Sequence, residues 1–288
     1  MAELSQWSTG NNAELYFMIS LLGLLVGSFL NVVIHRLPLM LERQWRRECA
    51  EFSGGTPQDE PALSLCQPRS RCPHCRHQLG VLDNVPLLSW LWLRGRCRHC
   101  SGPISRRYPL VEMASAGLAA LALWRFGVSP ALAGALVLGW TLLCLTLIDL
   151  DHLLLPDNLT LPLLWLGLLV NINGLFVPLE DAVLGAVFGY GVLWSLYWLF
   201  KLATGKEGMG YGDFKLLAAL GAWLGWPSLL PILLLASFSG ALAGLALMAS
   251  RRLGQDRVLP FGPALALAGG LYLLWGPGMM KLYWSLTL

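Results

Sequence analysis

The stretch LVLGWTLLCLTLID, Leu136 to Asp149, carries no charge until its last residue, which is a carboxylate. It lies inside an apolar run long enough for the ~20 residues that cross the hydrocarbon core of a bilayer. The rest of the chain is similar in character, since 56% of its 288 residues are hydrophobic and only 13% are charged. Soluble domains carry about 25% charged residues. The sequence therefore predicts an all-α polytopic membrane protein.

Apolar runs of this kind recur along the chain and predict about eight transmembrane helices. The sixth run is short, so it is either packed within the bundle or partly re-entrant. The first run follows acidic residues and lacks a small-residue cleavage site, so we expect a retained helix and not a signal peptide. The predicted spans are 14–37, 108–126, 129–150, 158–177, 182–203, 214–226, 228–250 and 260–280.

The basic residues predict how these helices are oriented. With alternating topology, only Arg125 and Lys281 of the 20 basic residues fall on the side opposite the rest. Because basic loops stay in the cytosol, both termini are expected on the outer side. Residues 1–37 then form the N-terminus and first helix, 38–107 a small cytosolic insertion, and 108–288 the main membrane bundle. The other loops predicted to be cytosolic are 151–157, 204–213 and 251–259.

Two C-x2-C pairs, in RCPHCRHQLG and GRCRHCSGPIS, lie within the insertion; their cysteines are Cys72, Cys75, Cys97 and Cys100. Two-residue spacing lets both thiolates of one turn reach a single tetrahedral ion. A cytosolic location disfavours the alternative of two disulfides, and so small a unit needs a staple. We therefore predict a structural zinc site. His74, His77 and His99 are expected at the surface, because four cysteines complete the ligand set.

Carboxylates at the edge of membrane segments are the second feature that calls for a function. Asp149 and Asp151 are two residues apart, about 200° around a helix, so they cannot share one face. Asp151 is expected to be solvated, and Asp157, which follows Pro156, is expected to be a helix N-cap. All three are predicted at the cytosolic face.

Asp213 lies in GMGYGDFKL, just before the sixth apolar run. It could cap the following helix or act chemically, and the two roles are compatible because helix N-termini favour negative charge. The glycines Gly208, Gly210 and Gly212 favour the chemical role, since they suggest that another backbone must come close.

Two carboxylates that face one another can share a proton, so that one activates water while the other protonates a carbonyl oxygen. This pattern indicates peptide hydrolysis of the aspartic-protease kind. Two other classes of protein stay open: a transporter with aspartate ligands, which would need polar groups at mid-bilayer, and a non-enzymatic scaffold whose zinc unit recruits a partner. A scaffold would tolerate asparagine at Asp149 and Asp213.

Six segments together resemble the bacterial type IV prepilin peptidases. They are GLLVGSFLNVVIHRLP (Gly23 to Pro38), the two cysteine pairs, GPISRRYPLVE (Gly102 to Glu112), DLDHLLLPDNLT (Asp149 to Thr160) and GMGYGDFKL (Gly208 to Leu216). The resemblance implies an aspartic endopeptidase that cleaves the leader of prepilins and pseudopilins at the cytosolic face of the bacterial inner membrane. It also implies N-methylation of the new terminus with S-adenosylmethionine, and hence a role in type IV pili or type II secretion.

The same resemblance implies the site residues. Asp149 corresponds to the first aspartate of D-x6-P-D and Asp213 to that of G-x-G-D, while the four cysteines belong to the cytosolic insertion. It gives no residues for the S-adenosylmethionine site. No nucleic-acid partner is expected, and the oligomeric state stays open.

Three further features of the membrane segments have open interpretations. Gly23 and Gly27 form G-x-x-x-G, which is typical of close helix packing. Asn31 and Arg36 either line the substrate path or snorkel toward the interface. Glu112 either pairs with a nearby arginine or serves the site.

Overall fold

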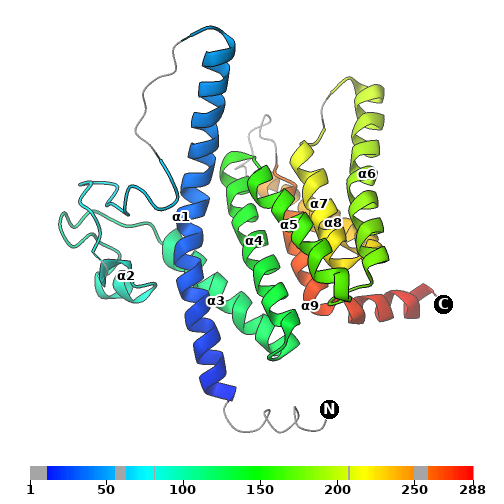
Figure 1. Ribbon diagram of the computed structural model, residues 1–288, viewed down its shortest axis with the longest axis horizontal. Coiled ribbons are helices and arrows are strands. Elements are labelled where there is room, and N and C mark those ends of the chain that lie inside the picture. Colours follow the sequence, from blue (N-terminus) through cyan, green and yellow to red (C-terminus); the bar gives the residue numbers. More distant parts are fainter. Residues whose placement is uncertain (1–11, 56–62, 81, 207, 250–258, 288) are drawn as a thin grey trace. The chain divides into compact units, whose positions relative to one another are not determined.

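The computed structural model describes residues 12–55, 63–80, 82–206, 208–249 and 259–287 (Figure 1). Residues 1–11 of the predicted outer N-terminus and most of the predicted loop 251–259 lie outside the described residues. The chain divides into two compact units, residues 1–128 and 129–288.

The first unit contains two long helices joined by the insertion. Helix α1 spans Asn12–Phe52 and α3 spans Arg107–Phe126, with the short elements η2 (Leu82–Asn84) and α2 (Leu88–Trp92) between them. Helix α1 does not stop where the first predicted span ends at residue 37. It continues through Pro38, because the residues that follow are rich in strong helix formers such as Leu, Glu, Arg and Gln. Part of the predicted insertion is therefore an extension of α1.

Helices α1 and α3 pack through the two glycines of the predicted G-x-x-x-G motif. A Cβ atom at Gly23 would lie 2.6 Å from the Cα of Ala116, and one at Gly27 would lie 2.7 Å from the Cα of Glu112. The Oγ of Ser115 donates to the carbonyl of Gly23 at 2.6 Å, buried between the helices. The interpretation of the motif as a helix-packing face is confirmed.

Alanine at Gly27 should destabilise the first unit by about 1–3 kcal/mol, because the added methyl meets a backbone that cannot rotate away. Gly117 lies on α3 with nothing within 4 Å of the place where a Cβ would stand. Thermal unfolding of the purified protein should show a lower midpoint for Gly27→Ala and an unchanged or slightly higher midpoint for Gly117→Ala, because alanine has the higher helix propensity. Equal midpoints for both variants would contradict this account of the packing.

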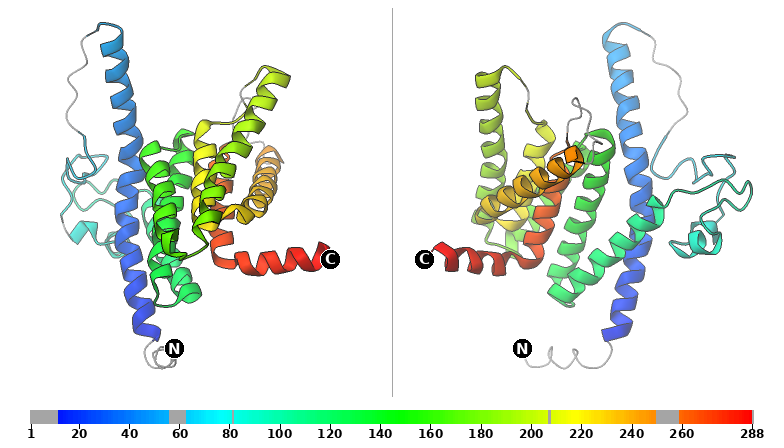
Figure 2. Two further views of the ribbon diagram at one scale, coloured as in Figure 1. Left: turned by 45° about the vertical axis from the view of Figure 1, so that its right-hand side comes forward. Right: turned by 180° about the vertical axis from the view of Figure 1, so that it is seen from behind.

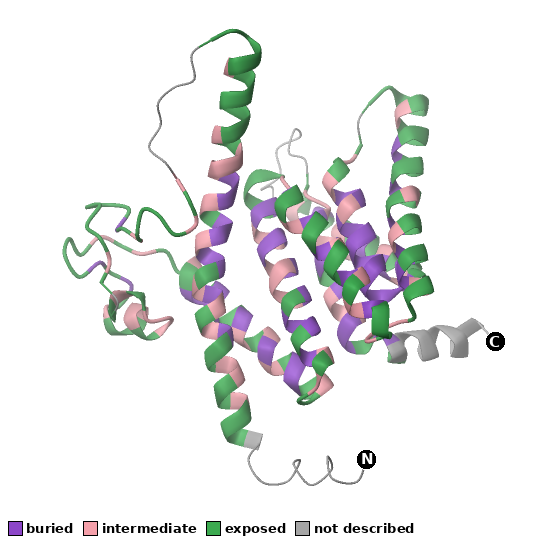
Figure 3. Ribbon diagram, viewed as in Figure 1, coloured by how far each residue is buried: buried purple, intermediate pink, exposed green. Residues whose placement is uncertain are grey.

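The second unit is a bundle of helices around α7 (Figure 2). Helix α7 packs against α5, α6 and α9, while α8 and α4 both contact α9. Within α7 the run from Phe214 to Leu224 is almost wholly buried (Figure 3). The short sixth apolar run is therefore packed within the bundle. The elements are α4 Pro130–His152, α5 Asp157–Val170, η3 Asn171–Asn173, α6 Leu179–Thr204, α7 Tyr211–Leu224, η4 Trp226–Ser228, α8 Leu229–Ala249 and α9 Gly262–Thr287.

Small residues and one buried amide hold α7 in place. The backbones of Gly185 on α6 and Gly221 on α7 touch, so neither position has room for a side chain. The Nδ2 of Asn171 donates to the carbonyls of Ala222 and Trp223 at 2.9 and 3.1 Å. These are carbonyls of the last turn of α7, which lack partners within the helix. The C-terminal half of this short helix can thus stay buried with the carbonyls of Ala222 and Trp223 satisfied.

The helical membrane fold is confirmed. Among the residues that the structure describes, four helices are long and apolar enough to cross a membrane: Ala13–Phe52, Pro130–His152, Leu179–Thr204 and Trp226–Ala249. No strand is assigned in the described ranges, which hold only two isolated β-bridges. The count of eight spans stays a prediction.

Candidate active site and metal centre

Asp149 lies in the last turn of α4 and is 5% exposed. Helix α4 ends at His152, and the next residue, Leu153, adopts a left-handed conformation and donates its backbone N–H to the carbonyl of Asp149. The carboxylate faces the first residue of α9, where a Cβ at Gly262 would lie 2.5 Å from Asp149 Oδ2. Among the described residues that oxygen has no hydrogen-bond partner, while the backbone of Gly262 bonds to the same carboxylate. A buried polar atom left unpaired is costly, which makes Asp149 a candidate for a functional role.

Asp213 lies in the first turn of α7 and is 7% exposed. The helix begins at Tyr211, so the N-cap position belongs to Gly210 and not to Asp213. Asp213 donates its N–H to the carbonyl of Gly210 at 3.2 Å, and its carboxylate accepts from the Gly210 backbone. Both bonds fix the first turn, so the carboxylate is presented from a rigid helix end.

The second unit brings Asp149 and Asp213 together. They are close enough for repulsion between the two charges to act on Asp213. Leu155 lies beside both positions: it would be 3.1 Å from a Cβ at Gly262 and 2.8 Å from one at Gly212. Two buried carboxylates from separate helices therefore lie near one another, as a pair that acts together in catalysis requires.

The three glycines before Asp213 lie in different surroundings. Gly212 gives room to Leu155, and Gly208 gives room to the ring of Phe200, whose atoms would lie 2.9 Å from an added Cβ. At Gly210 there is nothing within 4 Å. Only Gly210 therefore leaves open space for an incoming chain, and the expectation that all three glycines admit another backbone is too broad.

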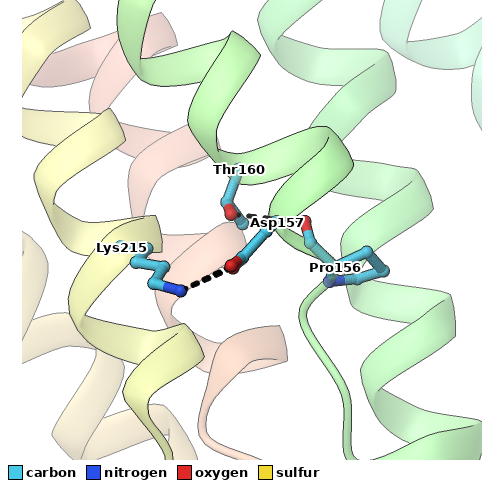
Figure 4. Close-up of polar contacts among 4 residues, drawn as sticks. All are labelled: Pro156, Asp157, Thr160 and Lys215. Atoms are coloured by element: carbon cyan, nitrogen blue, oxygen red, sulfur yellow. Dashed lines mark hydrogen bonds and ion pairs between the residues drawn. The ribbon is translucent and has the colours of Figure 1, made fainter. Parts of the chain in front are cut away.

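The remaining carboxylates of the motif lie elsewhere. Asp151 is exposed, as predicted. Asp157 is the first residue of α5, and its N-cap is Pro156. The carboxylate of Asp157 accepts both of its bonds from Lys215 Nζ, at 2.6 and 2.8 Å (Figure 4). The N-cap interpretation of Asp157 is therefore wrong, because the preceding proline takes that place and the side chain reaches across to α7.

The four predicted cysteines cluster in the first unit. Their Sγ atoms all lie within 4.8 Å of one another, and those of Cys72 and Cys100 are 3.8 Å apart. A tetrahedral ion with metal–sulfur bonds of roughly 2.3 Å would set its ligands about 3.8 Å apart. A hydrogen bond from the backbone of Cys75 lowers the pKa of the Cys72 thiol to about 6, which favours the thiolate form that binds metal. The residues present thus fit a zinc ion.

The two cysteine turns are copies of one another, a repeat that the sequence analysis missed. In each, the first cysteine donates its N–H five residues onward, to His77 from Cys72 and to Gly102 from Cys97. Arg76 and Ser101 occupy the same left-handed position after the second cysteine. The isolated bridges Arg71–Gln78 and Arg96–Pro103 also correspond. Aligning the two motifs at an offset of 25 residues would have revealed the repeat.

The histidines beside the cluster are exposed, as predicted. His77 and His99 stack on one another with ring centroids 3.6 Å apart, and His74 Nε2 lies 3.1 Å from the carbonyl of Pro103. Their side chains thus join the two turns from outside. Cys49 and Cys66 are exposed, and Cys144 is buried.

Serine at Cys97 should reduce the zinc content of the purified protein from about one ion per chain to a small fraction, because the tetrahedral set loses a thiolate. Metal analysis by mass spectrometry measures this directly. Serine at Cys49, which is exposed and outside the cluster, serves as the control and should leave the zinc content unchanged. Purified wild-type protein that contains no zinc and is as stable as protein supplied with zinc would contradict the metal site.

Polar side chains of α1 and α3 form hydrogen bonds that join these two helices to each other and to the insertion. Asn31 Nδ2 donates to the carbonyl of Tyr108 at 3.1 Å, and Glu112 Oε2 accepts from the Leu87 N–H at 2.7 Å. Arg36 donates to three loop carbonyls, those of Ser64, Leu65 and Pro68. These contacts give Asn31, Arg36 and Glu112 a structural role in the first unit.

Two family models match the chain. Residues 21–126 match the bacterial peptidase A24 N-terminal domain, and residues 136–245 match the type IV leader peptidase family. The chain belongs to this peptidase family. The match of both models in order spans the cysteine turns and both buried aspartates, so the family covers the metal centre and the candidate active site alike.

Several curated relatives are similar over nearly their full length. The prepilin leader peptidase/N-methyltransferase of Aeromonas hydrophila is 57% identical, over 95% of this chain and 94% of the relative. Proteins of the same name from Stutzerimonas stutzeri and Pseudomonas aeruginosa are 54% and 53% identical, each over 91% of both chains. No solved structure matches this one.

Proposed function

We propose that this membrane enzyme is a prepilin leader peptidase and N-methyltransferase. The observation that supports the proposal is the proximity of two buried carboxylates, Asp149 and Asp213, at the end of α4 and the start of α7 in a chain of this family. The substrates are prepilins and pseudopilins, cleaved between the leader and the mature chain. Exported pilin-like proteins of type IV pili and type II secretion are the expected clients.

The cleavage uses the pair as one acid and one base. One carboxylate takes a proton from a water molecule, whose oxygen attacks the scissile carbonyl carbon, while the other carboxyl protonates the carbonyl oxygen. The carbon–nitrogen bond then breaks and the departing amine receives a proton from the pair. Burial of both side chains excludes bulk water, which strengthens these charge interactions. The two titrations belong to the pair and not to either residue.

The second activity would transfer a methyl group to the amino terminus that cleavage exposes, with S-adenosylmethionine as the donor. The amine nitrogen attacks the donor's methyl carbon, the carbon–sulfur bond breaks, and the nitrogen loses a proton. This step has no residue assignment in the present site.

The membrane arrangement is part of the same proposal. Eight spans place both termini in the periplasm and the insertion in the cytosol, in the bacterial inner membrane. Residues 1–37, 38–107 and 108–288 then act as the first helix with its outer N-terminus, the zinc-bearing insertion and the peptidase bundle. Zinc would hold the two cysteine turns together when bound, because Cys72, Cys75, Cys97 and Cys100 supply a complete set of ligands.

The direct test uses the purified chain in proteoliposomes with a prepilin substrate and methyl-labelled S-adenosylmethionine. Intact mass of the product separates leader loss from methylation, and the label reports methylation alone. The expected result is a product that lacks its leader and carries one labelled methyl group. A chain that leaves prepilin intact would favour the transporter or the scaffold. Cleavage without label would show that this chain has the first activity only.

A further inference from the structure

The insertion presents an apolar face to its surroundings where a soluble module would present a polar one. In α2, Leu88, Leu91 and Trp92 are 64%, 55% and 86% exposed. They are spaced i, i+3 and i+4, so they share one face of the helical turn. Leu82, in the element just before, is 72% exposed. Contiguous exposed apolar side chains of this kind mark an interaction surface.

The inward side of the same turn explains why this face points outward. Trp90 packs on Gly95, where a Cβ would lie 2.8 Å from the indole ring, and its Nε1 donates to the carbonyl of Ile104 at 3.3 Å. Trp90 thus fills the small core beside the second cysteine turn. The neighbouring apolar residues cannot turn inward as well, because that core is already occupied.

A hydrogen bond to α3 fixes the level along that helix at which α2 begins. Glu112, 7% exposed, accepts from the backbone N–H of Leu87, the residue just before α2. Glu112 lies about 7.5 Å beyond Arg107 along α3, at ~1.5 Å per residue. Its Cα also faces Gly27, which lies within the first predicted span. The start of α2 is therefore tied to α3 below the arginines that begin the helix, at a level where both helices are apolar.

We infer that the face formed by Leu82, Leu88, Leu91 and Trp92 lies in the headgroup and upper acyl region of the bilayer. The insertion is then a peripheral membrane element and not a module standing in water. Charge agrees with this partner, since exposed Arg94 and Arg96 follow the apolar turn and would meet the anionic headgroups of a cytosolic leaflet. The inference rests on the membrane placement of α1 and α3 and does not depend on the peptidase activity.

The test places a photo-crosslinking amino acid, p-benzoylphenylalanine, at single positions of the full-length chain in proteoliposomes of phosphatidylethanolamine and phosphatidylglycerol. Position 92 is the test site, and its high exposure leaves the fold undisturbed. Phe17, 70% exposed within the first span, is the positive control. Phe52, 97% exposed at the far end of α1, is the negative control. Mass spectrometry of the irradiated chain identifies the partner at each position.

The expected result is a lipid adduct at position 92 with a yield close to that at position 17 and roughly tenfold above that at position 52. Replacing the phosphatidylglycerol with phosphatidylcholine should reduce the yield at position 92 and leave that at position 17 unchanged. Adducts with residues 129–288, with a second copy of the chain or with added prepilin would each overturn the inference, because the face would then be a protein interface. A yield at position 92 as low as that at position 52 would also overturn it.

Discussion

Replacing Asp213 with asparagine should reduce the rate of leader cleavage by about three orders of magnitude, because the amide keeps the shape of the side chain but cannot exchange a proton. Asp213 is buried in the first turn of α7 with its backbone bonded to Gly210, so helix formation does not depend on ionisation. We expect normal insertion and an unchanged unfolding midpoint. Cleavage in membranes, followed by gel shift of the prepilin, measures the effect.

The same loss is expected for Asp149→Asn, and the double variant should be no slower than either single one. Residues that act as a unit are not additive, since removing one already disables the pair. Asp151→Asn is the matched control: it lies two residues from Asp149 but is exposed, so its rate should stay within about threefold of wild type. Normal cleavage by Asp213→Asn would mean that the pair is not the catalytic group. Loss of cleavage in Asp151→Asn would mean that the wrong carboxylate of α4 had been chosen.

Alanine at Gly262 should slow cleavage by about a hundredfold, since a displacement on the order of 1 Å at a catalytic group can have this effect. The added methyl would stand 2.5 Å from Asp149 Oδ2 and 3.1 Å from Leu155 Cδ1, so the carboxylate must move. The α9 helix itself gains from alanine, which has the higher helix propensity. The predicted defect is therefore in the turnover number, with substrate affinity and folding little changed.

Gly270→Ala, on the same helix, is the control for that experiment. Nothing lies within 4 Å of the place where its Cβ would stand, so this variant should cleave at the wild-type rate. Steady-state kinetics on both variants, with thermal unfolding alongside, separates a moved carboxylate from a damaged helix. A wild-type turnover number for Gly262→Ala would show that the contact with Asp149 does not position the carboxylate.

The sequence by itself determined the features that depend on composition and short spacing. A chain with so few charges has to lie in a membrane, and helices are the structure that satisfies its backbone there. The cysteine turns were predictable for the same reason, because C-x2-C geometry is local and two such turns complete one metal site. The carboxylates beside apolar runs could be singled out as candidates because such a group is costly and needs a purpose, whereas the choice of Asp149 over Asp151 came from the family resemblance.

Only the tertiary structure decided which of these residues meet. Asp157 follows a proline at the start of a helix and so looked like a cap, yet it pairs with Lys215, 58 residues away. Gly262 lies more than a hundred residues from Asp149 and gives no local sign of the contact that limits its side chain. Helix propensity and hydropathy act over a few residues, whereas these pairings arise when separate helices pack and leave room only for particular shapes. Packing also explains why one short run, α7, became the buried centre of its unit, since its small residues allow neighbouring backbones to approach.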